Sequence, residues 1–456
     1  MTKKESVIES ASNRREFLKT TGTAAAAIGF VKVPVYGQDK APSANVQGAN
    51  NRIVLGHIGV GGQGGAHVRH TQTHRQENNV VSAAISDVST FRIDEKMGWV
   101  KDKGQNPDVK GYKDYRKLLE RKDIDAIFCG TVDHWHTNVS CDALETGKHV
   151  YCEKPMTRYL GEAFRIYDTV KKTGKVLQVG AQKTSETKWL EAARLINAGE
   201  IGKVVMLQGS YMRNNPKGEW NYTIQNWATA KDIDWKTWIN PVHNKIPFNA
   251  DHYFRWRKYQ PYCGGLLGDL LPHKLHPYLL ATGNPEFPKR VASVGSIPCE
   301  TDKNTPNTYR RDVPEITQMI AEFPSGTVAH FTSSTVNEVG TQEMIRGQKA
   351  TLTMAGNKVQ LNPERPFTDE IDPYTSKEST GGPVPDHHKN WLNAIRTGTQ
   401  PSCNIDLAIK VQTLLCLAEM SERMNIMCLF DEKTRKITTG DGKEIEAITY
   451  GTLPLS

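Results

Sequence analysis

The amino-acid sequence predicts an α/β protein of two domains, the first built on a parallel sheet and the second on a large, mainly antiparallel sheet. Its 456 residues are enough for two or three domains, each with its own core. Over residues 52–180, short apolar runs alternate with helical patterns, which is typical of βαβ units. After Leu207 the runs are longer, and turn signals such as "PSG" and "AGN" separate them, which favours antiparallel strands. We therefore expect domains at residues 51–180 and 181–456.

The first βαβ unit contains the glycine-rich stretch "GHIGVGGQGGAHV", residues 56–68. Gly59, Gly61 and Gly64 fit the pattern G-x-G-x-x-G, which indicates a dinucleotide site only where a strand precedes it and a helix follows. The apolar run "RIVL" predicts that strand, and "QGGAHVRHTQTH" predicts the helix. A second strand-like run, "NVVSAAIS", ends just before Asp87, where a Rossmann domain places the acid that binds the adenosine ribose. The N-terminal domain is therefore predicted to be a Rossmann dinucleotide-binding domain.

The other elements are predicted from the same two periodicities. In the first domain "DAIFCGT", "HVYCEKP" and "VLQVGAQ" are typical of strands, and "DYRKLLERKDI" and "NVSCDALETGK" have apolar positions at helical spacing. In the second domain "VVMLQGSYMR", "RVASVGSI", "ITQMIAEFPSGTVAHFTSSTV" and "ATLTMAGNKVQL" predict strands. Late helices are expected near residues 387–396 and 407–424, and residues 363–386 are expected to form a long surface loop.

Composition does not indicate nucleic acid as a partner, and none is expected. The formal net charge is +8, but residues 1–37 hold six Lys or Arg and three Asp or Glu, which leaves about +5 for the rest. That charge is dilute, and the sequence has no arginine stripe or aromatic and basic interleaving of the kind that nucleic-acid binding uses. The eight cysteines stand singly, without a C-x-x-C pair or metal-ligand spacing. We expect mostly reduced thiols and no essential disulfide.

The N-terminus predicts export. "SNRREFLK", residues 12–19, followed by the apolar run "TTGTAAAAIGFV", resembles a twin-arginine signal. The apolar run is too short to span a bilayer, so no stable membrane anchor is expected. We place a signal peptide at residues 1–37 and a polar linker at 38–50, with the twin-arginine export machinery as a partner and a periplasmic or secreted location. The simpler alternative is a frayed basic tail.

A third motif, "YCEKP" at residues 151–155, closes a strand at the carboxyl edge of the predicted parallel sheet, where α/β proteins bind ligands. Together with "GVGGQG" and "GGLLGDLLPHKLH", it resembles the Gfo/Idh/MocA oxidoreductase family, and the resemblance covers nearly everything from Arg52 onward. The resemblance implies an N-terminal Rossmann domain and a C-terminal α/β domain whose large open sheet walls the active site. It also implies that Lys154, Asp269 and His273 form the catalytic set used on a sugar or cyclitol hydroxyl.

Elementary chemistry gives these three residues coherent roles. Oxidation of a secondary alcohol by nicotinamide moves a hydride to the ring and a proton to a base, while the protein supplies orientation and electrostatics. His273 suits the base because histidine titrates near neutral pH, so a neutral-pH limb is expected in the rate profile. Lys154 can stabilise the alkoxide that develops on the substrate, and Asp269 can hold Lys154 or His273 in place. The structural alternatives are a solvated strand-end lysine, a helix-capping aspartate and a packed histidine.

Asp269, His273 and His276 also share one helical face, as a carboxylate and two-histidine metal site would require. A proline disturbs the helix directly after His276, and the resembled family does not ordinarily need a metal, so no metal is expected. His276 is instead expected to contact the substrate, together with Arg255 and Trp256 of "YFRWRKY". Sugars stack their apolar faces on aromatic rings and present hydroxyls to charged donors.

The expected cofactor is NAD rather than NADP. Asp87 would accept hydrogen bonds from an unmodified ribose and repel a 2′-phosphate, and the nearest arginine is Arg92, five residues on. A twin-arginine substrate folds before export, and the periplasm has no obvious pool of free NAD, so the cofactor is expected to be tightly held. The expected cofactor contacts are Gly59, Gly61, Gly62, Gly64, Asp87, Thr131, His134, Glu153 and Lys154.

The sequence thus predicts an exported NAD-dependent oxidoreductase that acts on a carbohydrate or related polyol. The export signal and "DHWH", residues 133–136, look most like the secreted members of the family. Two alternatives stay open: an NAD-dependent glycoside hydrolase that oxidises its sugar transiently, and a non-catalytic sugar-binding protein on the same fold. The open sheet face favours a homodimer or homotetramer.

Overall fold

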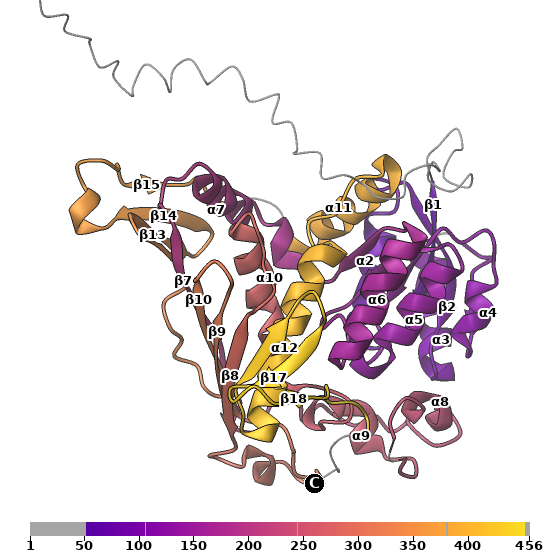
Figure 1. The fold of residues 1–456 in the computed structure, drawn as a ribbon. Helices are drawn as coiled ribbons and strands as arrows, with labels where there is room; N and C mark the ends of the chain where they lie inside the picture. The colour runs from indigo at the N-terminus through magenta and orange to yellow at the C-terminus, as the bar shows by residue number, and fades with distance from the viewer. Residues whose placement is uncertain (1–51, 105, 244, 380–381, 452–456) are drawn as a thin grey trace, which may run out of the picture. The chain divides into compact units, whose positions relative to one another are not determined.

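The computed structural model describes residues 52–451 with the exception of 105, 244 and 380–381 (Figure 1). The predicted signal peptide, residues 1–37, and the predicted linker, residues 38–50, lie outside the described residues. Among the helices that are described, none has the length and apolar character needed to cross a membrane.

The N-terminal domain is built on a six-stranded parallel sheet with the order β3-β2-β1-β4-β5-β6. This is the strand order of a Rossmann fold, which binds its ligand where the order reverses, here between β1 and β4. The strands are β1 (Ile53–Ile58), β2 (Val80–Ser86), β3 (Lys110–Tyr112), β4 (Ala126–Cys129), β5 (His149–Cys152) and β6 (Leu177–Val179). The helices are α2 (Gly62–Thr73), α3 (Thr90–Gly104), α4 (Tyr115–Leu119), α5 (Asp133–Glu145) and α6 (Leu160–Thr173). The predicted Rossmann domain is confirmed.

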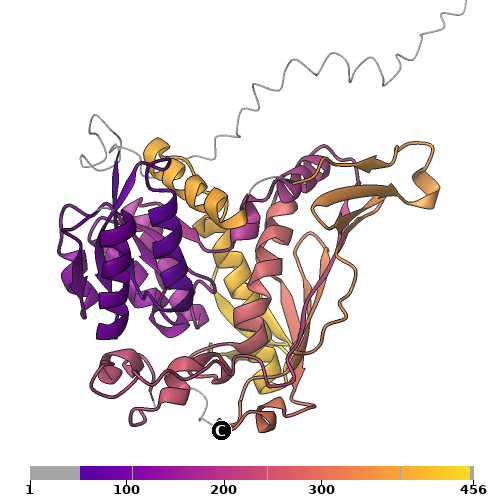
Figure 2. The same cartoon turned by 180° about the vertical axis from the view of Figure 1, so that it is seen from behind.

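The central strands of this sheet are apolar throughout because both of their faces are covered. Every residue of β4 and β5 is buried, as expected for a parallel sheet between two helical layers. Part of the cover comes from late in the chain, because Trp391 and Ile395 of α11 (Pro383–Thr397) pack against Phe128 and Tyr151. Figure 2 shows α11 beside the N-terminal domain. Helix α11 therefore completes the core of the first domain, although it lies some two hundred positions beyond the predicted domain boundary at residue 181.

The second domain is built on a twelve-stranded sheet with the order β15-β14-β13-β12-β7-β10-β9-β8-β16-β17-β18, with β11 paired to β7. All described strand pairs in it are antiparallel except β7 with β10, which confirms the predicted, mainly antiparallel sheet. The strands are β7 (Val204–Asn214), β8 (Arg290–Ser296), β9 (Ile316–Glu322), β10 (Val328–Ser334), β11 (Val336–Asn337), β12 (Met344–Gly347), β13 (Ala350–Ala355), β14 (Lys358–Pro363), β15 (Tyr374–Thr375), β16 (Cys428–Asp431), β17 (Lys436–Thr439) and β18 (Glu444–Ile445).

The longest described helix, α12 (Ile405–Met424), packs on α6 of the first domain and on β8 of the second (Figure 1). It is capped at its start by Asn404, whose side chain accepts hydrogen bonds from the backbone of the first turn. Contact on both sides explains why its sequence is apolar around most of its circumference. The other helical elements are η3 (Gln182–Ser185), α7 (Thr187–Asn197), α8 (Trp235–Ile239), α9 (Ala250–Phe254), η4 (Trp256–Lys258), η5 (Leu266–Leu270), α10 (Pro272–Ala281), η6 (Thr301–Asn304) and η7 (Arg365–Phe367).

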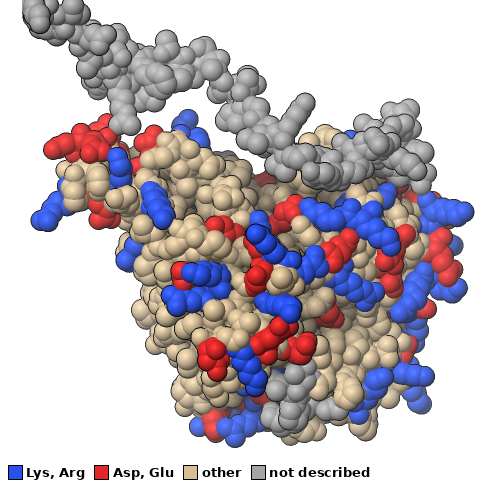
Figure 3. Space-filling model, viewed as in Figure 1, with Lys and Arg blue, Asp and Glu red and all other residues tan. Residues whose placement is uncertain are grey.

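Charge and thiols are distributed as in an ordinary globular protein. On the face drawn in Figure 3, positively and negatively charged side chains are intermixed. All eight cysteines are free thiols, and all but Cys299 are buried.

Candidate active site

A cavity of about 710 Å³ lies at the carboxyl edge of the parallel sheet, within the usual size range of small-molecule sites. The first domain contributes the glycine loop, the ends of β2, β4 and β5, and the start of α5. The second domain contributes residues from the segment after β7 and from η5 and α10. Predicted residues that line the cavity are Gly59, Gly61, Gly62, Asp87, Thr131, Glu153, Lys154, Trp256, Asp269 and His273.

The glycine loop leaves room for a ligand to approach the protein backbone at the start of α2. Gly59 has φ +74°, and a Cβ there would lie 2.5 Å from the backbone nitrogen of Thr131. A Cβ on Gly64 would lie 1.8 Å from the carbonyl oxygen of Gly59, so Gly64 allows close packing of helix on strand although it does not line the cavity. A Cβ on Gly62 would meet nothing within 4 Å. The loop fits a dinucleotide whose pyrophosphate lies at the N-terminus of α2.

Asp87 follows β2 directly and is positioned by two backbone amides. Its Oδ2 accepts a hydrogen bond from the nitrogen of Val60 at 2.8 Å, and its Oδ1 accepts one from the nitrogen of Ser89 at 2.9 Å. Arg92 lines the same end of the cavity, with its guanidinium 5.0 Å from the centre of the Tyr253 ring. Asp87, which is expected to favour an unmodified ribose, and Arg92, the nearest arginine in the sequence, therefore both line the cavity.

Lys154 and Asp269 join the two domains inside the cavity. The Lys154 Nζ lies 2.7 Å from Asp269 Oδ1, and Arg257 donates to the same oxygen from 2.9 Å. The indole N–H of Trp220 donates to Asp269 Oδ2 at 3.0 Å. Burial alone raises the pKa of Asp269, but Lys154 and Arg257 outweigh it and hold that pKa far below its usual range. Asp269 is therefore a fixed anion, and its hydrogen bonds are made with these side chains.

The structure accordingly excludes two simpler interpretations of this pair. Asp269 does not cap α10, since it lies in the π-helical turn η5 and the residue before α10, Leu271, makes no side-chain cap. Lys154 is not a solvated lysine, because only 10% of its side chain is exposed and its ammonium is bound to Asp269.

His273 is the second residue of α10 and lines the cavity from the second domain. Its ring is 5.7 Å from that of Tyr211. Burial, aided by the charge of Lys154, lowers the pKa of His273 to about 3. The imidazole is thus neutral across the physiological range, which differs from the expectation of titration near neutral pH. The reason is desolvation, which penalises the imidazolium.

The carboxylate of Glu153 is hydrogen-bonded to buried His67, which in turn contacts buried His388. Its Oε1 lies 2.7 Å from Nε2 of His67, and Nδ1 of His67 lies 2.9 Å from Nε2 of His388. Gln182 donates to the same carboxylate at 3.0 Å. Burial raises the pKa of Glu153, but the hydrogen bond from His67 outweighs this and the pKa is lowered to about 2. The sequence assigned no chemistry to His388, and no local pattern connects it to a residue more than two hundred positions earlier.

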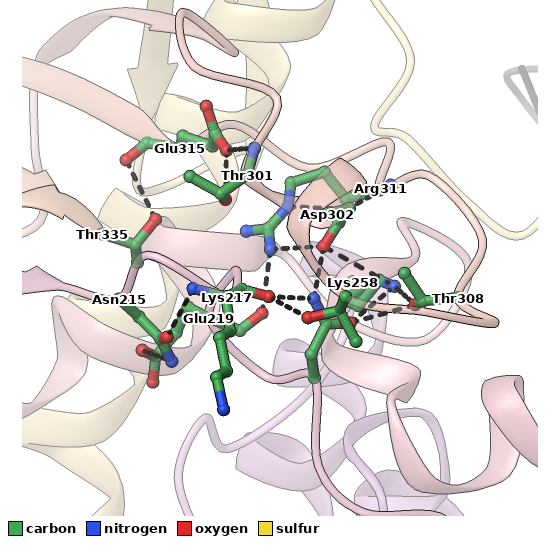
Figure 4. A network of polar contacts seen from close by, with 12 residues as sticks. Asn215, Lys217, Glu219, Lys258, Thr301, Asp302, Thr308, Arg311, Glu315 and Thr335 are labelled. Atoms are coloured by element: carbon green, nitrogen blue, oxygen red, sulfur yellow. Dashed lines mark hydrogen bonds and ion pairs between the residues drawn. The ribbon is translucent and has the colours of Figure 1, made fainter.

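Trp220 has an unusual backbone conformation, with φ +67°. The residue before it, Glu219, belongs to a polar network with Arg311, Asp302 and Lys258 (Figure 4). Arg311 donates to the carbonyl oxygen of Glu219 at 2.9 Å and to Asp302 at 2.8 Å. Lys258 lies 3.7 Å from Asp302. A non-glycine residue in the left-handed region persists only where its surroundings hold it. This network therefore supports the indole that binds Asp269.

Three predicted contacts lie outside the cavity. His134 bonds the carbonyl oxygen of Trp238 at 2.9 Å, and His276 bonds that of Pro272 at 2.8 Å. Arg255 is buried and donates to Asp251 at 2.7 Å. With His276 turned to its own helix and Asp269 bound by cations, the two-histidine metal site does not form. Of the two arginines in the cluster "YFRWRKY", the one that lines the cavity is Arg257, next to Trp256, and this aromatic and basic cluster was its signal in the sequence.

The comparisons with known proteins agree with this geometry. Residues 53–181 match the family model GFO_IDH_MocA, described as "Oxidoreductase family, NAD-binding Rossmann fold". An inositol 2-dehydrogenase of Klebsiella pneumoniae is 33% identical over 209 residues, 44% of this chain and 59% of the relative. A glycosyl hydrolase family 109 protein of Shewanella pealeana is 27% identical over 248 residues, 51% of each chain. The chain thus spans between half and three fifths of the length of these curated relatives.

Solved structures extend the likeness to most of the chain. A levoglucosan dehydrogenase in complex with NADH and levoglucosan has a TM-score of 0.62 at 18% identity, covering 82% of this chain and 98% of its own. An aldose–aldose oxidoreductase of Caulobacter crescentus, in complex with glycerol, has a TM-score of 0.61 at 17% identity, covering 83% of this chain and 100% of its own. At that identity the likeness shows the fold of both domains. Residues 53–181 thus match the NAD-binding Rossmann domain of this oxidoreductase family, and the solved structures extend the likeness in fold to the second domain.

Proposed function

We propose that this protein is an exported, NAD-dependent oxidoreductase that acts on a secondary hydroxyl of a sugar, cyclitol or related carbohydrate. The observation that carries the proposal is the 2.7 Å pairing of Lys154 with Asp269, because it joins the two domains inside the cavity that the glycine loop enters. His273 lines the same cavity. The inositol 2-dehydrogenase relatives support the substrate class.

Bound NAD would supply the hydride acceptor. Lys154 places an ammonium where negative charge develops on the substrate oxygen, and Asp269 fixes that ammonium. His273 is the proposed base: burial lowers its pKa to about 3, which keeps the imidazole neutral and able to accept the hydroxyl proton but also makes it a weak base. Arg257 keeps Asp269 ionised, and Trp256 beside it offers a flat apolar face within the cavity.

The proposed export of the protein bears on how the cofactor is used. A twin-arginine substrate crosses the membrane folded, so NAD taken up in the cytoplasm has to be retained and regenerated in place. Regeneration requires either a second sugar or carbonyl acceptor or reversal of the enzyme's own oxidation. We therefore propose that NAD co-purifies at near-stoichiometric levels, dissociates slowly, and makes activity nearly independent of added NAD.

A second candidate is an NAD-dependent glycoside hydrolase that oxidises its sugar transiently. The glycosyl hydrolase family 109 relative favours it, and so does the α-N-acetylgalactosaminidase of Shewanella oneidensis, 27% identical over 252 residues. Both candidates begin with the same hydride transfer and use Lys154 and His273 in the same way. They differ in whether a glycosidic bond is cleaved.

One screen separates the candidates. Purified protein would be incubated with free sugars and cyclitols, with sugar–carbonyl pairs and with aryl glycosides, while nicotinamide absorbance and aglycone release are followed. Interconversion of a sugar pair without aglycone release supports the oxidoreductase, and aglycone release without net NADH supports the hydrolase. The Lys154→Ala variant, assayed in parallel, should lose either activity. Bound NAD with no turnover on any set would leave the non-catalytic sugar-binding alternative and refute the proposal.

The outer face of the large sheet supports a homo-oligomer. Val294, Ile320 and Val328 lie on the neighbouring strands β8, β9 and β10 and are 75%, 53% and 37% exposed. In the strand register, Ile320 is opposite Ala292 and Val328 is opposite Glu322, so these side chains share one face. We propose that a second copy of the chain covers this face in a dimer or tetramer, which sedimentation of the wild type and of a Val294→Lys variant would test.

A further inference from the structure

Three metal-ligand groups meet beside the cavity, although the sequence has no metal-ligand spacing. Cys129 is the last residue of β4 and Cys152 the last of β5, and the two are directly opposite each other in the parallel pair. His136 comes from the first turn of α5. One ligand atom from each of the three lies within 4.8 Å of the others, and all three residues are at most 1% exposed.

Both ring nitrogens of His136 face carbonyl oxygens, which are hydrogen-bond acceptors. Its Nδ1 is 2.7 Å from the carbonyl oxygen of Pro155, and its Nε2 is 3.2 Å from the carbonyl oxygen of Thr131. A neutral imidazole has a single N–H and cannot donate to both. With Nδ1–H given to Pro155 at the shorter distance, the Nε2 lone pair faces the Thr131 oxygen. A cation bound to Nε2 removes that conflict, and a carbonyl partner on the other nitrogen is the usual support of a metal-binding histidine.

We propose that Cys129, Cys152 and His136 bind one borderline-soft transition-metal ion, for which Zn²⁺ is the representative, with the Thr131 carbonyl oxygen toward the fourth position. Two thiolates neutralise a divalent cation, so a buried site carries no net charge. Tetrahedral zinc places sulfur and nitrogen ligands about 3.4–3.8 Å apart, so side-chain rotations that close the cluster by about 1 Å suffice. Binding displaces the two thiol protons to solvent, and no electrons are transferred.

Nearby groups agree with an ion at this position. The hydroxyl of Ser140, one helical turn after His136, is fully buried and hydrogen-bonds the Cys152 thiol. It lies on the side of α5 that carries His136. The site lies immediately before Thr131 and Lys154, both of which line the cavity. An ion here would tie the ends of β4 and β5 and so fix the two turns that present these residues.

The test uses the full chain, purified under reducing conditions and stripped with a chelator. Co²⁺ is the probe, because thiolate ligands give it a near-ultraviolet charge-transfer band and tetrahedral ligands give intense visible bands. We expect saturation at one Co²⁺ per chain, displacement by Zn²⁺, and a higher melting temperature with either ion. Cys129→Ser and Cys152→Ser should each abolish the charge-transfer band. Cys141→Ser is the matched control: it lies on α5, is equally buried and contacts Thr169 instead, so the band should persist.

X-ray absorption of the zinc-loaded wild type keeps the proposal testable if a serine variant does not fold. Two sulfur and one or two nitrogen or oxygen scatterers are expected. A metal content well below one per chain after loading, or scattering by nitrogen and oxygen alone, would overturn the site. A chain lighter by two hydrogen atoms, with Cys129 and Cys152 in one cross-linked peptide, would show that the pair forms a disulfide instead. These outcomes are independent of the proposed oxidoreductase activity.

Discussion

Arg257→Met removes one of the two cations that hold Asp269 while leaving the lysine and the indole in place. Arg257 donates to Asp269 Oδ1 at 2.9 Å, and the ammonium of Lys154 shares that oxygen at 2.7 Å. A hydrogen bond to a charged group contributes about 1.5–3 kcal/mol. If the whole of this contribution positions Lys154 for the transition state, kcat/KM should fall about tenfold to 150-fold.

The same substitution has a pH signature that a general loss of structure would not produce. Arg257 helps to depress the pKa of Asp269, so its removal raises that pKa. A carboxylate with a depressed pKa functions above that pKa and fails as the pH falls through it, so the acid limb of kcat/KM should move to higher pH. The assay is kcat/KM as a function of pH on the substrate that the screen identifies, with NAD affinity measured by nucleotide fluorescence. NAD affinity should change little.

Arg255→Met is the matched control because it removes the same side chain two residues earlier. Arg255 pairs with Asp251 away from the cavity, so its loss should lower the melting temperature without moving the acid limb. Unchanged kcat/KM and an unchanged acid limb in Arg257→Met would refute the reasoning, as would an equal shift of the limb in Arg255→Met.

The remaining predictions concern the same cavity. Lys154→Ala should lower turnover about a hundredfold or more while largely sparing cofactor binding, as for a preorganised electrostatic group, and pre-steady-state kinetics would check this. His273→Ala should be as damaging, and the wild type should show no limb from this residue near neutral pH, because protonation sets in only as the pH falls toward about 3. Asp87→Ser should narrow the preference for NAD over NADP, and tighter wild-type binding of NADP than NAD would contradict the assignment. Because the pKa of Glu153 is lowered to about 2, its stabilising contribution is present above the ordinary carboxyl pKa and is lost on acidification toward 2. His67→Leu should remove it, so the stability gap to wild type, measured by urea unfolding, should be wide at pH 6 and shrink as the pH falls.

The sequence by itself determined the parts of the site that are set by short spacing. A strand followed by Gly59, Gly61 and Gly64 at the start of a helix predicts the strand–loop–helix geometry of a dinucleotide site. Glycines are needed there where φ is positive or where two backbone segments are in close contact. The same holds for Lys154 at the end of a strand and for Asp269 four residues before His273. The alternation of apolar runs likewise determined which domain has a parallel sheet, since each period follows from local backbone geometry.

Only the tertiary structure decided which neighbours these residues have. Helix α9 ends at Phe254 and a new 3-10 turn begins at Trp256, so helical periodicity is broken there and cannot show which arginine of the cluster reaches Asp269. The bond between His67 and His388 depends on α11 folding back over the first sheet. Cys129 and Cys152 face each other because β4 and β5 are in register. In each case the partners come from elements that are distant in the chain and are brought together by packing. The burial and the charges that then act on each side chain leave no local pattern in the sequence.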